Sequence, residues 1–368
     1  MRTAVRVLLG TLIVACGTSS ADETSILNGE PSPPSSGSGP SSSSSGTNGG
    51  GETSTPGDAG ADAQPYTGPI SCAAPVPAGA ARPLALPVYA GTCPTLAVPP
   101  ALTKIGDREF LVHRPTTIAA GEKLPVIFLW HWLGGSADKM SSILEVQAAA
   151  EKHRFIAVIP VSKSDALFRW PFEASQSQAR IDEETKFFDD MLACVGAALP
   201  VNADCVSTAG VSAGALWSAQ LAVARSQRIS SFVSLSGGVG GFVRGWSTVP
   251  HRMPALVLWG GDNDVYPEQF TIVNFKNASD DLEDALGKDD HFVVECTHNC
   301  GHAVPPFDPP PPGGLRFDMM WRFLLDHPYW LAPNQSPYKT GALPSSFPSW
   351  CAAGIGKATP RPAGSVCE

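Results

Sequence analysis

The chain has little charge, and its charge is mostly acidic. Only 16% of its 368 residues are charged, with 34 acidic against 25 basic residues and a formal net charge of −9. The acidic residues are scattered singly, and no basic cluster is present that would attract nucleic acid or anionic lipid. Beyond the N-terminus no apolar run is long enough for a membrane-spanning helix, and no internal repeat is visible. We therefore expect neither a nucleic acid partner nor a membrane-embedded domain.

Cysteine, by contrast, is abundant. Nine cysteines are many for a cytosolic protein and indicate an oxidising compartment. Arg2 and Arg6 precede a short apolar run at 7–15, as in a secretory signal peptide. The following Ile13-Val14-Ala15-Cys16 resembles the bacterial lipobox, which implies lipidation of Cys16. We expect an exported protein anchored to the cell envelope, at the outer membrane or cell surface, with secretion as the alternative.

The composition predicts three regions. Residues 1–16 form the predicted lipoprotein signal peptide. Residues 17–65 are dominated by Ser, Gly, Pro and Thr, which bury too little apolar surface to fold, so we expect a disordered tether. Residues 66–368 form the predicted folded domain, beginning with an irregular wrap rich in Pro and Ala, and 43% hydrophobic residues overall are ample for a large core.

Within the predicted domain, strand patterns alternate with helix patterns. Apolar or alternating runs typical of strands lie at 108–113, 125–130, 155–160, 205–209, 231–235, 255–259 and 292–295. Helical spacing lies at 139–152, 181–198, 215–224 and 315–325. Such alternation predicts an α/β fold, a mostly parallel, doubly wound sheet with helices on both faces.

One turn between a predicted strand and a predicted helix carries the motif Gly210-Val211-Ser212-Ala213-Gly214. This Gly-x-Ser-x-Gly pattern is typical of a nucleophile elbow, in which glycines permit a tight turn and the serine is exposed above the sheet. The amide of Ala213, at the start of the helix, is a predicted oxyanion donor. A small-residue turn with an incidental serine is the alternative.

A serine nucleophile needs a base and an orienting acid. Asp262 and Asp264 follow the strand at 255–259, and His298 and His302 follow the strand at 292–295. Loops at the carboxyl ends of later strands supply these partners in a doubly wound sheet. The order serine, aspartate, histidine is that of the α/β-hydrolases, but it does not choose between the two candidates in either loop.

Over roughly 108–327 the chain resembles α/β-hydrolases of the polyhydroxybutyrate depolymerase, feruloyl esterase and acetylxylan esterase group. These carry Gly-x-x-Asp after the seventh strand and Gly-His in the histidine loop. Gly261-Asp262-Asn263-Asp264 and Gly301-His302 match those motifs. The resemblance implies an α/β-hydrolase fold with Ser212 as nucleophile, His302 as base and Asp264 as acid. Asp262 is then a turn residue.

The segment Trp130-His131-Trp132-Leu133-Gly134-Gly135 stands where the family has its oxyanion loop. The family pattern is His-Gly followed by the donor residue, and Trp132 replaces that glycine here. We expect the amide of Leu133 to be the second oxyanion donor, with Trp132 as the alternative. The side chains of Trp132, Trp170 and Phe172 are predicted to line an acyl or aryl pocket, whereas Trp217 is expected to pack its helix.

If Cys16 is lipidated, eight cysteines remain. Proximity in sequence predicts the pairs Cys72–Cys93, Cys194–Cys205, Cys296–Cys300 and Cys351–Cys367, although spacing does not determine connectivity. The short Cys296–Cys300 bridge would fix the loop that carries His302. Cys296, His298, Cys300 and His302 alternate in a way unlike zinc-binding spacings, so no metal is expected.

These patterns predict an extracytoplasmic serine esterase that forms an acyl-enzyme. The implied substrates are polyesters or esters linked to plant polysaccharides, and no cofactor is needed. The predicted contact with a membrane is through the N-terminal lipid alone. A serine peptidase of the same fold and a non-catalytic surface binding protein on a hydrolase scaffold are the alternatives.

Overall fold

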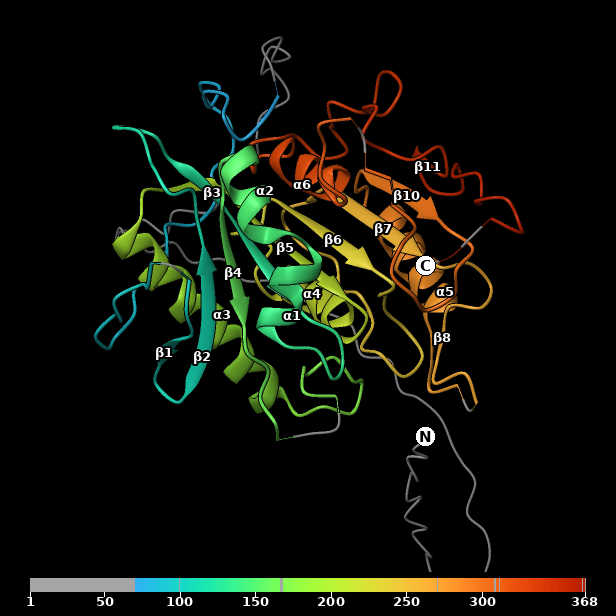
Figure 1. Ribbon diagram of the computed structural model, residues 1–368, viewed down its shortest axis with the longest axis horizontal. Helices are drawn as coiled ribbons and strands as arrows, with labels where there is room; N and C mark the ends of the chain where they lie inside the picture. The colour runs from blue at the N-terminus through green and yellow to red at the C-terminus, as the bar shows by residue number, and fades with distance from the viewer. Residues whose placement is uncertain are drawn as a thin grey trace, which may run out of the picture. The chain divides into compact units, whose positions relative to one another are not determined.

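The computed structural model describes a nine-stranded sheet with helices on both of its faces (Figure 1). The described residues are 70–98, 100–165, 168–269, 271–307, 309–310, 312–365 and 367. The predicted signal peptide at 1–16, including Cys16, and the predicted tether at 17–65 lie outside them. In the described part of the chain, no helix combines the length and the apolarity that crossing a bilayer requires.

The central sheet has the strand order β1-β2-β4-β3-β5-β6-β7-β10-β11, and β8 pairs with β9 in a separate hairpin. Strands β4, β3, β5, β6, β7 and β10 run parallel, while β1, β2 and β11 are antiparallel to their neighbours. The strands are β1 (Thr103–Ile105), β2 (Arg108–His113), β3 (Leu124–Trp130), β4 (Ile156–Pro160), β5 (Val201–Val211), β6 (Ser231–Leu235), β7 (Ala255–Trp259), β8 (Val265–Tyr266), β9 (Val273–Asn274), β10 (Val293–Thr297) and β11 (Cys351–Ala353).

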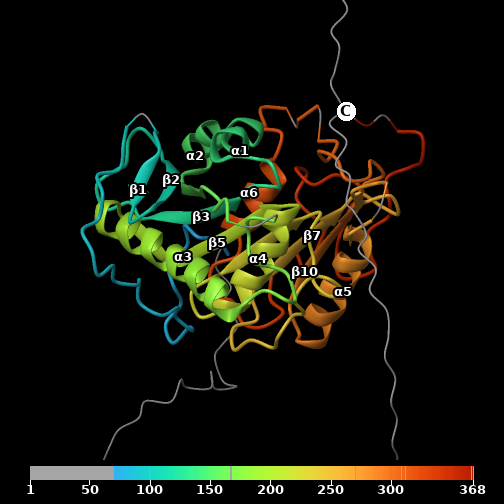
Figure 2. The same cartoon turned by 90° about the horizontal axis from the view of Figure 1, so that it is seen from below.

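Six helices cover the sheet within the described residues. They are α1 (Ala137–Ile143), α2 (Val146–His153), α3 (Gln178–Ala198), α4 (Ala213–Ala224), α5 (Phe275–Lys288) and α6 (Asp318–Leu325). Helices α3, α4 and α5 lie on one face and α1, α2 and α6 on the other (Figure 2). The predicted fold class, a mostly parallel sheet covered on both sides, is confirmed.

Every residue of β3, β4, β6, β7 and β10 is buried, as their continuous apolar runs predict for strands covered on both faces. The single helix expected at 139–152 is wrong. Glu145 adopts φ 51° and interrupts it, leaving α1 and α2 as separate helices. Helical spacing continues across this break, so the sequence pattern does not reveal it.

The register of the parallel strands aligns their carboxyl ends. Val211 of β5 pairs with Leu235 of β6, and Trp259 of β7 pairs with Thr297 of β10. The first residues beyond these four strands therefore lie along one edge of the sheet. They are Ser212, Ser236, Gly260 and His298.

All eight cysteines that were predicted to form disulfides do so, but each predicted pairing is wrong. The bonds are Cys72–Cys205, Cys93–Cys194, Cys296–Cys351 and Cys300–Cys367. Cysteines that are distant in sequence meet because the N-terminal segment lies against β5 and α3, and because β11 pairs with β10. In the latter pair, Cys296 is directly opposite Cys351. The thiols of Cys296 and Cys300 are thus in disulfides and offer no thiolate to a metal.

Candidate active site

Ser212 occupies a strained turn between β5 and α4. Its φ of 55° and ψ of −123° are rare for a residue with a side chain. A Cβ on Gly210 would lie 2.2 Å from the Gly214 carbonyl oxygen, and one on Gly214 would lie 2.0 Å from the Trp130 carbonyl oxygen. Glycine is therefore required on both sides of the serine, because the turn approaches both itself and the end of β3.

The side chains of Ser212, His302 and Asp264 form a continuous chain of hydrogen bonds. Ser212 Oγ lies 2.9 Å from His302 Nε2, and His302 Nδ1 lies 2.7 Å from Asp264 Oδ1. When Nδ1 carries the proton and donates it to the carboxylate, Nε2 is free to accept a proton from the serine. The structure thus brings together the three residues that the resemblance selected. Their geometry permits proton transfer from Ser212 to His302.

Asp264 is fully buried, and its carboxylate is well satisfied. Besides the bond from His302, its Oδ2 accepts hydrogen bonds from the Gly260 amide at 2.7 Å and the Ser236 hydroxyl at 2.8 Å. Burial of a carboxylate is costly unless such donors replace water. The three donors come from different loops along the same edge of the sheet and fix the orientation of the acid.

The imidazole of His302 is also held by aromatic contact. It stacks on Phe275 with ring centroids 4.2 Å apart and an interplanar angle of 8°, and Tyr266 lies 5.8 Å away. Phe275 is the first residue of α5, and its amide donates to the Asp264 carbonyl at 2.8 Å. Helix α5 therefore supports both the base and the acid.

The two rival residues lie elsewhere. Asp262 is exposed in the turn before Asp264. His298 is fully buried, and its Nδ1 accepts a hydrogen bond from the Cys300 amide at 3.2 Å. Burial lowers the pKa of His298 to about 4, so this ring is neutral near pH 7. Among the described contacts, His302 is the histidine hydrogen-bonded to Ser212.

Of the predicted oxyanion donors, Ala213 directly follows Ser212, and Leu133 and its alternative Trp132 line the same cavity as Ser212. Ala213 begins α4, and amides in the first turn of a helix have no acceptor within the helix. Trp132 and Leu133 follow the end of β3. The carbonyl of Trp132 accepts from the Gly135 amide at 2.9 Å, which closes a tight turn. Ala213 and Leu133 stay the predicted donors, with Trp132 as the alternative to Leu133.

A cavity of about 290 Å³ opens beside Ser212 and His302. Its walls are mainly apolar and include Leu133, Leu144, Leu235, Tyr266, Val304 and Phe317. Among the described residues that line it there is no Asp, Glu, Lys or Arg. A cavity of this chemistry favours an uncharged, apolar group. Its volume is near the lower limit for small-molecule sites, which suits a small group.

The aromatic residues predicted for this pocket have different positions. Trp132 lines the cavity, but Trp170 and Phe172 are almost fully buried and do not line it, so that expectation is wrong for both. Trp170 packs edge-on against Trp130, and Phe172 packs against Phe168. The loop folds inward because these large rings gain more from burial among other aromatic rings than from exposure.

Trp217 is fully buried, as expected for a residue that packs its helix.

Three residues of the site were not identified from the sequence. Ser236 follows a predicted strand directly, which was the available signal. Tyr266 and Phe275 belong to β8 and α5. No strand was predicted at β8, and the helical stretches expected between the later strands had no predicted bounds.

No protein-family model and no curated protein matches the sequence. Solved structures do match the fold. The structure titled sOPH native is 14% identical, covers 73% of this chain and 97% of its own, and has a TM-score of 0.55. The structure titled pOPH native is 16% identical with the same coverages and a TM-score of 0.54. A ferulic acid esterase matches more weakly, at 13% identity and a TM-score of 0.41, over 53% of this chain and 85% of its own.

Proposed function

We propose, from the α/β-hydrolase fold that the sheet order and these solved structures establish, that the protein is a serine ester hydrolase. The observation that carries the proposal is the hydrogen-bonded chain from Ser212 through His302 to Asp264, beside an apolar cavity that Ser212 and His302 line. The three side chains come from loops that follow β5, β7 and β10. This is the edge of a parallel sheet where α/β enzymes bind their ligands.

In the proposed reaction His302 Nε2 takes the hydroxyl proton of Ser212 while Oγ attacks the ester carbonyl carbon. The amides of Ala213 and Leu133 stabilise the negative charge on the carbonyl oxygen. Collapse of the tetrahedral intermediate breaks the bond to the alcohol oxygen, which receives the proton from His302. Water, deprotonated by His302, then attacks the acyl carbon, and the second tetrahedral intermediate breaks its bond to Ser212 Oγ. Ser212 Oγ takes the proton back from His302 as the acid is released. Asp264 stabilises the imidazolium in both steps.

The cavity supports an uncharged ester of modest size as the substrate. Its apolar walls carry no Asp, Glu, Lys or Arg among the described lining residues, so a charged acid part would lose its hydration without compensation. Esters in polyesters or attached to plant polysaccharides fit this description, because their acid parts are uncharged when esterified. The same argument disfavours charged peptide side chains in this cavity.

Ester turnover in Ser212→Ala tests the proposal. With p-nitrophenyl butyrate, we expect this variant to lose about 10⁴-fold or more in kcat, because triad members act as a unit. Ser218→Ala, a buried serine on the same helix, is the matched control and should retain its activity. A Ser212→Ala protein as active as the parent would overturn the proposed mechanism. A panel with methyl ferulate, acetylated xylan and polyhydroxybutyrate would define the acid part.

We also propose that the protein is exported and anchored by a lipid on Cys16. The four disulfides support an oxidising compartment, and the charged and apolar pattern of 1–16 supports a lipoprotein signal. Cys16→Ser should then move the protein from the membrane fraction to the soluble fraction. Retention of that variant on membranes in high salt would contradict the anchor.

A further inference from the structure

We infer that Trp170 is a positioning residue for the oxyanion loop, acting through its indole N–H. This inference rests on the proposed ester hydrolase function. Trp170 Nε1 donates a hydrogen bond to the carbonyl oxygen of His131 at 2.8 Å. His131 directly precedes Trp132 and Leu133, whose amides are the alternative oxyanion donors. The bond therefore holds the backbone one or two residues from the donor.

The hydrogen bond from Trp170 to His131 is buried, and the Trp170 ring also packs against two neighbouring rings. Trp170 is almost fully buried, and its ring meets Trp130 edge-on at 5.1 Å and His131 at 5.1 Å. Trp130 is the last residue of β3, so Trp170 spans the junction of that strand and the loop. Because water is excluded there, no solvent molecule replaces the indole as a donor to His131 when the N–H is removed. The carbonyl would then turn, and the peptide units after it would turn with it.

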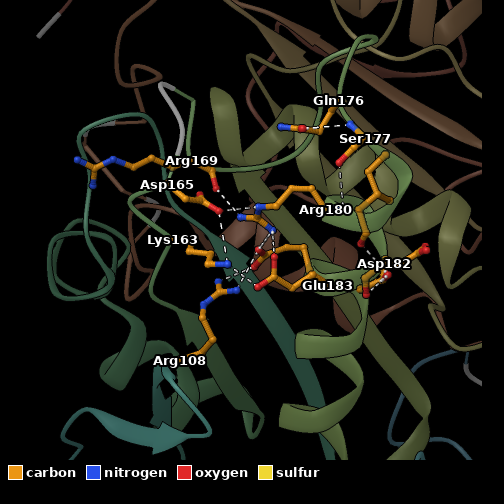
Figure 3. A network of polar contacts seen from close by, with 12 residues as sticks. Arg108, Lys163, Asp165, Arg169, Gln176, Ser177, Arg180, Asp182 and Glu183 are labelled. Carbon is orange, nitrogen blue, oxygen red and sulfur yellow. Dashed lines mark hydrogen bonds and ion pairs between the residues drawn. The ribbon is translucent and has the colours of Figure 1, made fainter.

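Ion pairs on α3 hold the segment that carries Trp170. The guanidinium of Arg180 donates to the carbonyl oxygen of Arg169 at 3.1 Å and to Glu184 at 2.6 Å. Glu184 is completely buried and also binds Arg108 of β2. Figure 3 shows the Arg169 side chain pointing away while its carbonyl faces Arg180. The network thus connects Arg108 of β2 to Arg169, the residue preceding Trp170.

Asp165 and Lys163 extend this network on its outer side. Asp165 lies 3.1 Å from Arg180 Nε and 3.6 Å from Lys163 Nζ. Figure 3 shows Asp165 between these two basic side chains. Arg169 itself has φ 62°, so the backbone changes direction just before Trp170. The Trp170 amide then donates to the Phe168 carbonyl at 2.7 Å. These contacts fix the direction of the indole independently of the oxyanion loop.

The chain offers a matched control in Trp217. This tryptophan is also fully buried and also meets Trp130 edge-on, at 6.0 Å. Its indole N–H has no hydrogen-bond partner among the described residues. Trp217→Phe and Trp170→Phe therefore remove similar packing from the same cluster, but only the second also removes a donor to the oxyanion loop.

The test compares the two variants by turnover and by binding of two inhibitors. Butaneboronic acid forms a tetrahedral anion on a serine and senses the oxyanion donors, whereas butyramide binds as an uncharged ground-state analogue. For Trp170→Phe we expect kcat/KM for p-nitrophenyl butyrate and the affinity for the boronic acid to fall together, by about ten- to a hundredfold. The affinity for butyramide should stay within about twofold. Trp217→Phe should leave all three quantities within about twofold of the parent.

Equal kcat/KM and boronic acid affinity in Trp170→Phe and the parent would overturn the inference and leave the ester hydrolase proposal intact. A parallel loss of butyramide affinity, or the same losses in Trp217→Phe, would show that Trp170 contributes packing alone. If Trp170→Phe does not fold, incorporation of 3-benzothienylalanine at 170 keeps the bicyclic ring and replaces the N–H donor with sulfur. The same results are then expected, and the same results would overturn the inference. A parent with neither Ser212-dependent turnover nor boronic acid binding would instead overturn both proposals.

Discussion

The acid of the candidate triad is distinguished from its neighbour by its surroundings. Asp264 is buried among three hydrogen-bond donors, and Asp262, two residues away, is exposed. Asp264→Asn should lower kcat by about 10⁴-fold, because an amide at this position favours the wrong tautomer of the histidine. Asp262→Asn should retain kcat within about twofold. Steady-state kinetics of the two purified variants on one ester would decide, and the reverse order of effects would move the acid to Asp262.

Among individual residues, those that lie just after the end of a strand could be placed at the site from the sequence alone. Ser212, Asp264 and His302 each come shortly after a continuous apolar run, and such runs become parallel strands that end at one edge. Trp170 could not be placed in this way. An aromatic residue in a loop is compatible with either a cavity wall or a buried support. The choice depends on tertiary contacts, above all the hydrogen bond to His131, which is distant in sequence.

Among the elements, the C-terminal segment is closely linked to the histidine loop. Cys300–Cys367 bonds the loop two residues before His302, and the Arg361 amide donates to the Thr297 carbonyl at 3.0 Å. Asn299 Nδ2 donates to the Pro362 carbonyl at 2.6 Å. The predicted short Cys296–Cys300 bridge is absent, and the chain near the C-terminus restrains the loop instead.

Removal of the Cys300–Cys367 bond by a double serine substitution should therefore lower both the melting temperature and kcat. A disulfide closing a long loop typically contributes about 2–4 kcal/mol of stability. The loss of kcat, about tenfold, would follow from looser placement of His302. Double replacement of Cys93 and Cys194, which are bonded across a sequence separation of 101, is the control. It should lower the melting temperature comparably and leave kcat unchanged at temperatures where both variants are folded. Equal kcat in the two variants would show that the tail does not position the base.

Most strands and helices could be predicted because burial on both faces produces continuous apolar runs, and burial on one face produces helical spacing. Disulfide pairing could not be predicted, because it depends on which strands become neighbours. Cys351 meets Cys296 only through the antiparallel pairing of β11 with β10. The break at Glu145 depends on a single backbone conformation that leaves the apolar spacing unchanged.

For the molecule as a whole, one buried carboxyl group affects the dependence of stability on pH. Glu283 of α5 is buried, and its Oε1 has no hydrogen-bond partner among the described residues. Burial, with a smaller contribution from the charges of Glu295, Asp280 and Asp284, raises its pKa to about 9. The group is thus protonated in the folded protein near pH 7 and ionised in the unfolded chain. The contribution of Glu283 to the free energy of unfolding is fully present below 4.5, the ordinary pKa of a glutamate in the unfolded chain. That contribution is lost as the pH rises toward 9.

Glu283→Gln should remove the loss of stability that Glu283 causes as the pH rises, because glutamine does not ionise. Free energies of unfolding from urea titrations at pH 5, 7 and 9 should decline less steeply in this variant than in the parent. Glu268→Gln, at an exposed position, is the matched control and should follow the parent. If Glu283→Gln and the parent change in parallel across this range, Glu283 is not protonated in the folded protein.

The central claim is that Ser212 is a nucleophile activated by His302, and covalent labelling tests it most directly. The folded protein would be incubated with a p-nitrophenyl alkylphosphonate, and the adduct counted by intact mass and located by peptide mass spectrometry. We predict one equivalent of label on Ser212, none in Ser212→Ala, and much slower labelling in His302→Gln. An unlabelled parent protein, or a label carried by a different residue, would contradict the account.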